Sequence, residues 1–319
     1  MSDGCIKMKT LKAEILLILA AVIWGMAFVA QVKGMEHVGP FTFNAARFLM
    51  GGISLLPLLY ILPRFQRVSP KKPASSGLLL GGILAGLFLF AGASLQQVGL
   101  QYTTAGKAGF ITGLYIVIVP IIALFWGHRA LPKVWLGAIL AVTGLYFLSI
   151  RGDFVLSYGD SLQLIGALFW AGHVLLLGWL SPRYNPIQLS IIQFLACGLI
   201  SLVISLVFEP TSPDTLLAAA GPIAYGGIMS VGVAFTLQVV GQQWVPASHA
   251  AIIISLEAVF AAIGGWWLLN EHLDGQAFFG CGLMLLGMIV SQWPSRRRAK
   301  ADTAVANDDN PLPAAPLAE

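Results

Sequence analysis

The chain has 319 residues, of which 57% are apolar and only 10% charged, and its mean hydropathy is +0.82. Soluble domains are about half apolar and a quarter charged, so this composition excludes an ordinary soluble fold and places the chain in a lipid bilayer. The formal net charge of +4 does not indicate a nucleic-acid partner, because the charges gather in short clusters between long apolar runs.

A helix that crosses the bilayer needs about 20 mostly apolar residues. The first apolar run, residues 15–30, lacks a small-residue cleavage site, so we expect a retained membrane helix rather than a signal peptide. Residues 1–12 then form an N-terminal segment, and the polar, Pro- and Ala-rich residues 294–319 form a disordered tail. Ten spans are expected, at residues 13–32, 42–62, 77–98, 104–126, 133–150, 160–181, 187–208, 216–240, 247–269 and 275–293.

Lysine and arginine predict the orientation, because loops rich in these residues stay in the cytoplasm. With ten spans and the N-terminus inside, most of the 18 lysine and arginine residues fall in inner segments, and the outer loops carry only Lys33 and Arg151. We therefore expect a multi-pass protein of the bacterial inner membrane with both termini in the cytoplasm.

The second half of the chain resembles the first. The segment "LQQVGLQYTTAGKAGFITGLYIVIVPIIA", from Leu95, aligns with "LQVVGQQWVPASHAAIIISLEAVFAAIGG", from Leu237, and "IWGMAF" aligns with "FWAGHV". Residues 13–150 and 151–293 are thus two expected five-span units. Because five is odd, the second unit enters the membrane from the opposite side. The expected fold is an all-α membrane protein in which two inverted five-helix repeats surround a central cavity.

Four segments carry a resemblance to a known family. They are "AVIWGMAFVA" in the first span, "FNAARFLMGG" in the second, "GLQYTTAGKAGFITGLYIVIVPIIAL" across the third and fourth, and "ISLEAVFAAIGGWWLLNEHLDGQAFFGCGLMLLGMIV" in the last two. Through them the chain resembles the EamA-like branch of the drug/metabolite transporter superfamily over residues 13–293. The resemblance implies a ten-helix bundle around a cavity that exports or exchanges small metabolites, and it names no substrate.

Glu257 lies about ten residues, or ~15 Å, into its expected span, close to the bilayer midplane. An ionisable side chain at this depth is a functional candidate by default. Two interpretations stay open: Glu257 binds a substrate amine or a proton, or its carboxyl group hydrogen-bonds a neighbouring helix and fixes the packing.

Two pairs of repeat partners are candidates for gate or structural residues. Arg47 and Gln193 occupy equivalent positions of the repeat, in the second and seventh spans. Arg47 can extend outward to the interface or bind an anionic group. Lys107 and His249 each stand at the start of a span, on opposite faces of the membrane. They are interpreted either as gate residues or as side chains that reach the interface.

The remaining candidates for the substrate or coupling site are polar and aromatic side chains within the spans. Their amides and rings suit zwitterionic or polar-aromatic solutes. His173 is expected to face the cavity, and a packing role is its alternative. Pro57 and Pro120 are expected to loosen their spans. These candidates are Trp24, Phe28, Gln96, Tyr115, Trp170, His173 and Gln238.

No enzyme motif, cofactor loop or metal-ligand spacing is recognisable, and Cys5, Cys197 and Cys281 are scattered. His249 and Glu257 are about two helical turns apart, ~12 Å, too far for a catalytic relay. We therefore expect no enzyme, no metal, no cofactor and no ATPase subunit. The sequence predicts a secondary transporter that exports amino acids or related amphiphilic compounds by alternating access, with protons coupled through Glu257; the alternative is an uncoupled, channel-like permease.

Overall fold

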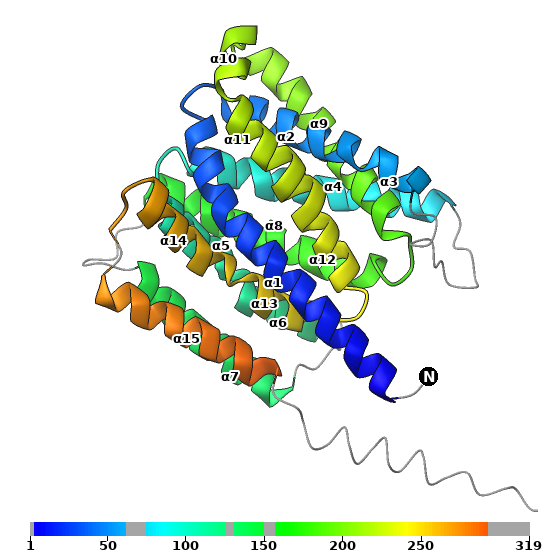
Figure 1. The fold of residues 1–319 in the computed structure, drawn as a ribbon, viewed down its shortest axis with the longest axis vertical. Coiled ribbons are helices and arrows are strands. Elements are labelled where there is room, and N and C mark those ends of the chain that lie inside the picture. Colours follow the sequence, from blue (N-terminus) through cyan, green and yellow to red (C-terminus); the bar gives the residue numbers. More distant parts are fainter. Residues whose placement is uncertain (1–2, 62–74, 126–130, 150–156, 273, 293–319) are drawn as a thin grey trace, which may run out of the picture.

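A computed structural model describes residues 3–61, 75–125, 131–149, 157–272 and 274–292. Within these ranges the chain is a bundle of helices joined by short turns, and no strand occurs (Figure 1). The expected tail, residues 294–319, lies outside the described residues, as does most of the basic segment between the second and third spans. The expectation of an all-α fold is confirmed for the part that is described.

The helices follow one another with few residues between them. The first half contains α1 (Asp3–Gly34), α2 (Pro40–Ser54), α3 (Leu56–Ile61), α4 (Ser75–Gly99), α5 (Ala105–Gly113), α6 (Tyr115–Phe125) and α7 (Pro132–Ser149). The second half contains α8 (Tyr158–Leu180), α9 (Pro186–Phe208), α10 (Pro213–Ala218), α11 (Ala220–Ala224), the π-helical η2 (Tyr225–Phe235), α12 (Thr236–Gly241), α13 (Ala247–Ile254), α14 (Glu257–Leu268) and α15 (Gly275–Gln292).

Eight helical stretches among the described residues are long and apolar enough to cross a membrane. They are Met8–Gly34, Pro40–Leu59, Ser76–Gly99, Ala105–Phe125, Tyr158–Leu180, Pro186–Phe208, Ala220–Gly241 and Ala247–Leu268. Two further apolar helices, Pro132–Gly144 and Phe278–Ser291, are shorter. Eight of the ten expected spans therefore meet the length criterion, and the crossings by α7 and α15 stay predictions.

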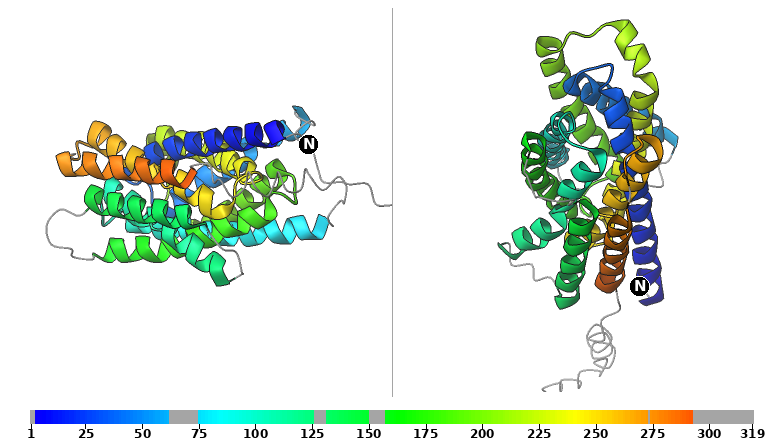
Figure 2. Two further views of the ribbon diagram at one scale, coloured as in Figure 1. Left: turned by 90° about the horizontal axis from the view of Figure 1, so that it is seen from below. Right: turned by 90° about the vertical axis from the view of Figure 1, so that its left-hand side faces the viewer.

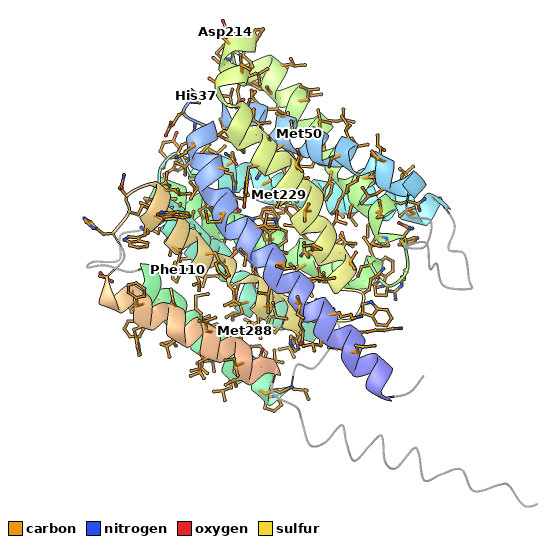
Figure 3. All side chains as sticks on the ribbon, in the orientation of Figure 1. His37, Met50, Phe110, Asp214, Met229 and Met288 are labelled. Atoms are coloured by element: carbon orange, nitrogen blue, oxygen red, sulfur yellow. The ribbon has the colours of Figure 1, made fainter. Side chains whose placement is uncertain are left out.

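The outside of the bundle is apolar along its length. Large side chains such as Leu80, Leu206 and Phe208 are exposed. Figure 3 shows His37 and Asp214 at one end of the bundle, whereas Met229 lies near its middle. An apolar belt with polar residues at its end is the surface that lipid requires.

Polar groups satisfy the backbone where helices begin. Asn185 accepts hydrogen bonds from the backbone N–H groups of Ile187 and Gln188 at the start of α9. Two carboxylates from distant segments do the same: Glu209 binds the start of α2, and Glu271 binds the start of α5. A carboxylate is favourable there because the first N–H groups of a helix are free and the helix dipole is positive at this end.

Two spans are interrupted near their middle, which the sequence analysis did not expect. Helix α5 ends and α6 begins around Leu114, and α13 ends and α14 begins around Leu256. At both joints the backbone makes shorter-range hydrogen bonds, from Leu114 N to Ile111 O and from Leu256 N to Ile253 O, each 3.2 Å long. Pro120, expected to loosen its span, lies inside α6 without interrupting it. The second span is interrupted close to Pro57, as expected.

The helices pack in pairs that join distant parts of the chain (Figure 2). Helix α2 lies against α9, α4 against α8, and α7 against α15. The last pair is in backbone contact: a Cβ atom on Gly137 would stand 2.6 Å from the carbonyl oxygen of Gly287. Glycine is therefore needed at this crossing so that the two backbones can approach each other.

Gly137→Ala is expected to lower the melting temperature, because the added methyl group meets backbone atoms that cannot yield unless α7 and α15 separate. Overpacking of this kind costs about 1–3 kcal/mol. Thermal unfolding of the purified protein in detergent measures the effect. Gly282→Ala on α15 is the matched control, since its Cβ would meet no atom within 4 Å. Equal melting temperatures for the two variants would contradict the close contact.

Candidate functional site

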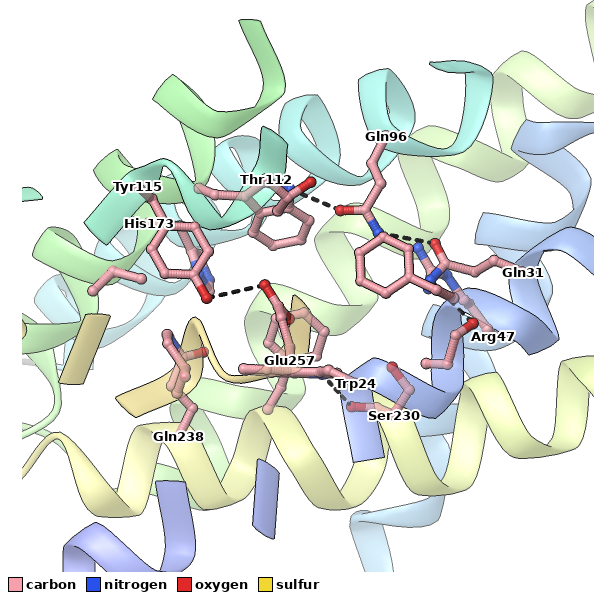
Figure 4. Close-up of a pocket in the computed structure, with 16 residues that line it drawn as sticks. Trp24, Gln31, Arg47, Gln96, Thr112, Tyr115, His173, Ser230, Gln238 and Glu257 are labelled. Carbon is pink, nitrogen blue, oxygen red and sulfur yellow. Dashed lines mark hydrogen bonds between the residues drawn. The ribbon is translucent and has the colours of Figure 1, made fainter. Parts of the chain in front are cut away.

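A cavity lies in the middle of the bundle, where the two interrupted spans meet α1, α2, α4, α8, η2 and α12. It contains about 490 Å³ of space free of atoms, which includes its open side. Its wall combines one carboxyl group, one guanidinium group, amides and aromatic rings (Figure 4). The lining residues are Trp24, Ala27, Phe28, Gln31, Arg47, Gln96, Thr112, Tyr115, Trp170, His173, Val174, Ser230, Phe235, Gln238, Ile254 and Glu257.

All eight residues named from the sequence as substrate or coupling candidates line this cavity. Of the four gate or structural candidates only Arg47 does so, whereas Lys107, Gln193 and His249 lie outside its wall. The roles of these residues stay predictions.

The sequence analysis missed further lining residues, among them Gln31, Thr112, Ser230 and Phe235. Gln31 and Thr112 are polar residues within expected spans, so the signal that selected Gln96 also applies to them. The backbone oxygen of Ser230 carries no sequence signal, because its availability depends on the local helix geometry.

Glu257 is held by a hydrogen bond from the opposite repeat. The Tyr115 hydroxyl group donates to Oε1 of Glu257 over 2.9 Å, and the two residues are 142 positions apart in the chain. That offset is the one at which Leu95 aligns with Leu237, so Tyr115 and Glu257 are equivalent positions of the two halves. Each is also the first residue after the interruption of its span. The two helix joints therefore meet at the cavity through repeat partners.

The carboxyl group of Glu257 has no basic partner within ion-pairing distance among the residues that the structure describes, and the residue is only 6% exposed. Its position at the first turn of α14 places it at the positive end of the helix dipole. The site thus supplies a hydrogen-bond donor and a favourable dipole, but no fixed cation.

Aromatic rings and amides form a second part of the wall. Trp24 Nε1 donates to the backbone oxygen of Ser230 over 3.2 Å, within the wide turns of η2. Trp170 Nε1 donates to Oε1 of Gln96 over 3.1 Å. Phe235 lies between the two indoles, with ring centroids 4.6 Å from Trp24 and 6.0 Å from Trp170. These contacts fix the rings, which form an apolar part of the cavity wall.

Several polar groups of the wall keep unused hydrogen-bonding capacity. His173 Nε2 lies 2.8 Å from Oε1 of Gln193, while His173 Nδ1 has no partner. Gln238 Oε1 also has no partner, although the residue is buried. Buried polar atoms are normally satisfied, so unsatisfied atoms at a cavity are positions where water or a solute can bind.

Arg47 does not extend to the membrane interface, as one interpretation of the sequence allowed. It is 3% exposed and lines the cavity. Its Nε donates to Oδ1 of Asn44 over 2.9 Å, and its Cζ lies 4.8 Å from the centre of the Phe48 ring. The guanidinium group therefore belongs to the inner wall.

Two pairs, each of an acidic residue with a lysine or a histidine, lie at opposite ends of the bundle; Lys107–Asp160 is an ion pair, whereas His249 only approaches Glu14 and its Nε2 makes no hydrogen bond. Lys107 Nζ is 2.6 Å from Oδ2 of Asp160, and His249 Nε2 is 3.5 Å from Oε1 of Glu14. The Lys107 end is the one where α1 finishes, since Ala105 and Ala108 pack with Phe28, whereas Glu14 stands near the start of α1.

These two pairs of residues are also equivalent by the internal repeat. Lys107 aligns with His249, and Glu14 and Asp160 each stand ten residues before an aligned tryptophan, Trp24 or Trp170. The sequence analysis identified the two basic residues but missed both acids, although the spacing from the tryptophans could have shown them.

No group of three histidine, cysteine, aspartate or glutamate residues that could hold a metal ion occurs in the described ranges. A helical bundle with interrupted spans around a polar and aromatic cavity is the architecture of a membrane transporter. The model of the EamA-like transporter family matches the chain twice, over residues 11–150 and 157–292. The chain belongs to the EamA-like transporter family.

Relatives agree with this assignment. The chain is 33% identical over 288 residues to an uncharacterized transporter of Archaeoglobus fulgidus, covering 90% of this chain and 88% of the relative. It is 22% identical over 292 residues to the uncharacterized transporter YoaV of Bacillus subtilis, covering 88% of this chain and 97% of the relative. A solved crystal structure superposes with a TM-score of 0.70 at 20% identity, covering 90% of this chain and 98% of that chain, and shows a shared fold. The protein is therefore a multi-pass membrane transporter.

Tyr115→Phe is expected to lower the free energy of unfolding by about 1–3 kcal/mol, because the buried Glu257 carboxyl group loses its donor. Glu257→Gln should cost less, since its amide oxygen still accepts from Tyr115. Thermal unfolding in detergent measures both, with Tyr102→Phe, at a residue that is 57% exposed, as the control. Equal melting temperatures for Tyr115→Phe and the Tyr102→Phe control would contradict a stabilising hydrogen bond from Tyr115 to Glu257.

Proposed function

We propose that the protein is a secondary transporter of the bacterial inner membrane that exports small organic metabolites, such as amino acids or related amphiphilic compounds, by alternating access. The observation that carries this proposal is the cavity at the meeting point of two interrupted spans, lined by a carboxyl group, a guanidinium group, amides and rings. Interrupted helices place backbone and polar side chains at membrane depth, where solute sites of transporters lie.

We further propose that residues 13–150 and 151–293 are inverted repeats that move against each other. The double match to one family model supports a duplication. The packing supports the inversion, because α1 lies against η2 and α14, and its counterpart α8 lies against α4 and α6. In addition, α8 begins at the end of the bundle where α1 finishes, as the position of Asp160 beside Lys107 requires.

In this proposal the Lys107–Asp160 ion pair and the His249–Glu14 contact hold the opposite ends of the bundle. Lys107–Asp160 closes the outer end, and His249–Glu14 closes the cytoplasmic end, with both termini in the cytoplasm. Because the pairs occupy equivalent positions, the movement that separates one pair can preserve the other. This is the arrangement that alternating access needs.

Glu257 is the proposed coupling residue. Without a fixed cation beside it, its carboxyl group can exist with a proton or accept a cationic group of the solute. The Tyr115 hydroxyl group donates to this carboxyl group from the other repeat, so a change in the protonation of Glu257 alters a contact with the span formed by α5 and α6. An uncoupled permease of the same fold is the alternative, in which Glu257 only holds the helices together.

Counterflow in proteoliposomes tests the proposal. Vesicles loaded with a mixed pool of amino acids and small aromatic amines, under an imposed pH gradient, are read by mass spectrometry. We expect gradient-driven movement of one compound class by the wild type, and loss of the gradient dependence in Glu257→Gln. Glu36→Gln, at an exposed residue, is the control and should behave as the wild type. Equal, gradient-independent equilibration by all three proteins would favour the uncoupled permease.

Lys107→Gln and His249→Gln are expected to expose the cavity from opposite sides. A reporter cysteine, Ala27→Cys, is placed in the cavity wall in a background without the native cysteines. Labelling by a membrane-impermeant thiol reagent should rise from the outer face in Lys107→Gln and from the cytoplasmic face in His249→Gln, because each variant weakens the contact at one end of the bundle. Increased labelling from the same face in both variants would contradict the gate assignment.

A further inference from the structure

Arg47 has no ion-pair partner among the described residues of the cavity wall. Arginine has five N–H donors and stays charged in proteins. Among the described hydrogen bonds of Arg47, only Nε has a partner, Oδ1 of Asn44. No carboxylate of the described residues lies within ion-pairing distance of the guanidinium group, although the residue is only 3% exposed.

The acidic side chains that could have served Arg47 are bound elsewhere. Asp160 pairs with Lys107, and Glu14 approaches His249. Glu209 binds the start of α2, Glu271 binds the start of α5, and Glu257 accepts from Tyr115. A buried cation is costly unless it is paired, so this one requires a partner that the protein does not supply.

The guanidinium group is held in a fixed position. Asn44 fixes Nε and is itself fixed by the hydrogen bond from its Nδ2 to the backbone oxygen of Ala93, 3.3 Å long. The rings of Phe43 and Phe48 lie 5.6 Å and 4.8 Å from Cζ. Because Nε is occupied, the two terminal nitrogens remain for a ligand. Two parallel N–H donors are the geometry that binds a carboxylate bidentately.

The internal repeat indicates that the fold does not need this charge. The equivalent position in the second half is Gln193, which is uncharged, lies outside the cavity wall and binds His173. One repeat thus packs the same position with an amide alone. The charge of Arg47 therefore serves the cavity rather than the shared helical framework.

We propose that Arg47 binds a carboxylate group of the transported compound, so that the substrates are small organic acids with an apolar body. This inference rests on the proposed function and names the substrate class of the same cavity.

The rings of Trp24, Trp170 and Phe235 receive the apolar body. Figure 4 shows Arg47 beside Gln31 on one side of the cavity, and Tyr115 and His173 on the other. An α-amino acid and its deaminated acid both carry the carboxylate that Arg47 requires. The amino acid also carries an ammonium group, which Glu257 can accept.

Ligand-induced stabilisation of the purified full-length protein in detergent tests the assignment. Three pools share the same side chains: α-amino acids, the corresponding deaminated acids, and the primary amides of the amino acids. A ligand that binds the folded state raises the melting temperature. We expect stabilisation by the amino acids, the deaminated acids or both, and none by the amides. The relative effect of the first two pools shows whether the ammonium group contributes.

Variants then assign the effect to Arg47. The dissociation constant of the best acid is expected to rise at least tenfold in Arg47→Gln, which installs the residue of the other repeat. The dissociation constant of Arg47→Lys should lie between those of Arg47→Gln and the wild type, because lysine keeps the charge and loses the bidentate geometry. Arg183→Gln, at an exposed arginine, should bind as the wild type. If Arg47→Gln does not fold, the affinity of Arg47→Lys and the comparison of the three pools test whether Arg47 binds the carboxylate.

Equal stabilisation by acids and amides, stabilisation by no pool, or full affinity in Arg47→Gln would overturn the assignment. Transport in proteoliposomes separates this failure from that of the proposed function. Gradient-driven transport of compounds without a carboxylate would overturn the role of Arg47 and leave the transporter intact. Carboxylate binding without any transport of the bound acids would leave the role of Arg47 and overturn the proposed function.

Discussion

The hydrogen bond between Tyr115 and Glu257 joins the two halves of the protein at the place where both are interrupted. A helix that breaks within a bilayer exposes backbone groups that lipid cannot satisfy, so such breaks occur only where protein or water meets them. Here each break is closed by a tighter backbone turn, and a buried polar side chain follows it directly. The cavity exists because these two breaks lie opposite each other.

The rest of the bundle supports this centre from its ends. Glu209 and Glu271 bind the first turns of α2 and α5, helices that carry or adjoin cavity residues. The Lys107–Asp160 ion pair and the equivalent His249–Glu14 contact stand at the two ends, and backbone contact at Gly137 holds α7 against α15. Charged groups are thus paired at the ends of the bundle, while the centre keeps polar groups whose partners are incomplete.

The two halves of the chain contribute different chemical groups to the cavity wall at some equivalent positions. Gln96 and Gln238 are equivalent and both line the wall, as do Trp24 and Trp170. Arg47 has no charged equivalent, because Gln193 occupies its position in the second half. The two similar halves therefore contribute unequal groups to the cavity wall: a guanidinium group from the first half and a carboxyl group from the second.

The sequence by itself determined the membrane location, eight of the spans and eight of the sixteen residues that line the cavity. Apolar length and isolated polar residues are local properties, and lipid leaves a polar side chain such as Glu257 or Gln96 no place other than the interior. Only the tertiary structure decided where the spans break, which partners Lys107 and His249 find, and that Arg47 faces the cavity rather than the interface. Those features depend on contacts between segments far apart in the chain, such as Glu14 with His249. The local pattern of apolar residues does not predict such contacts.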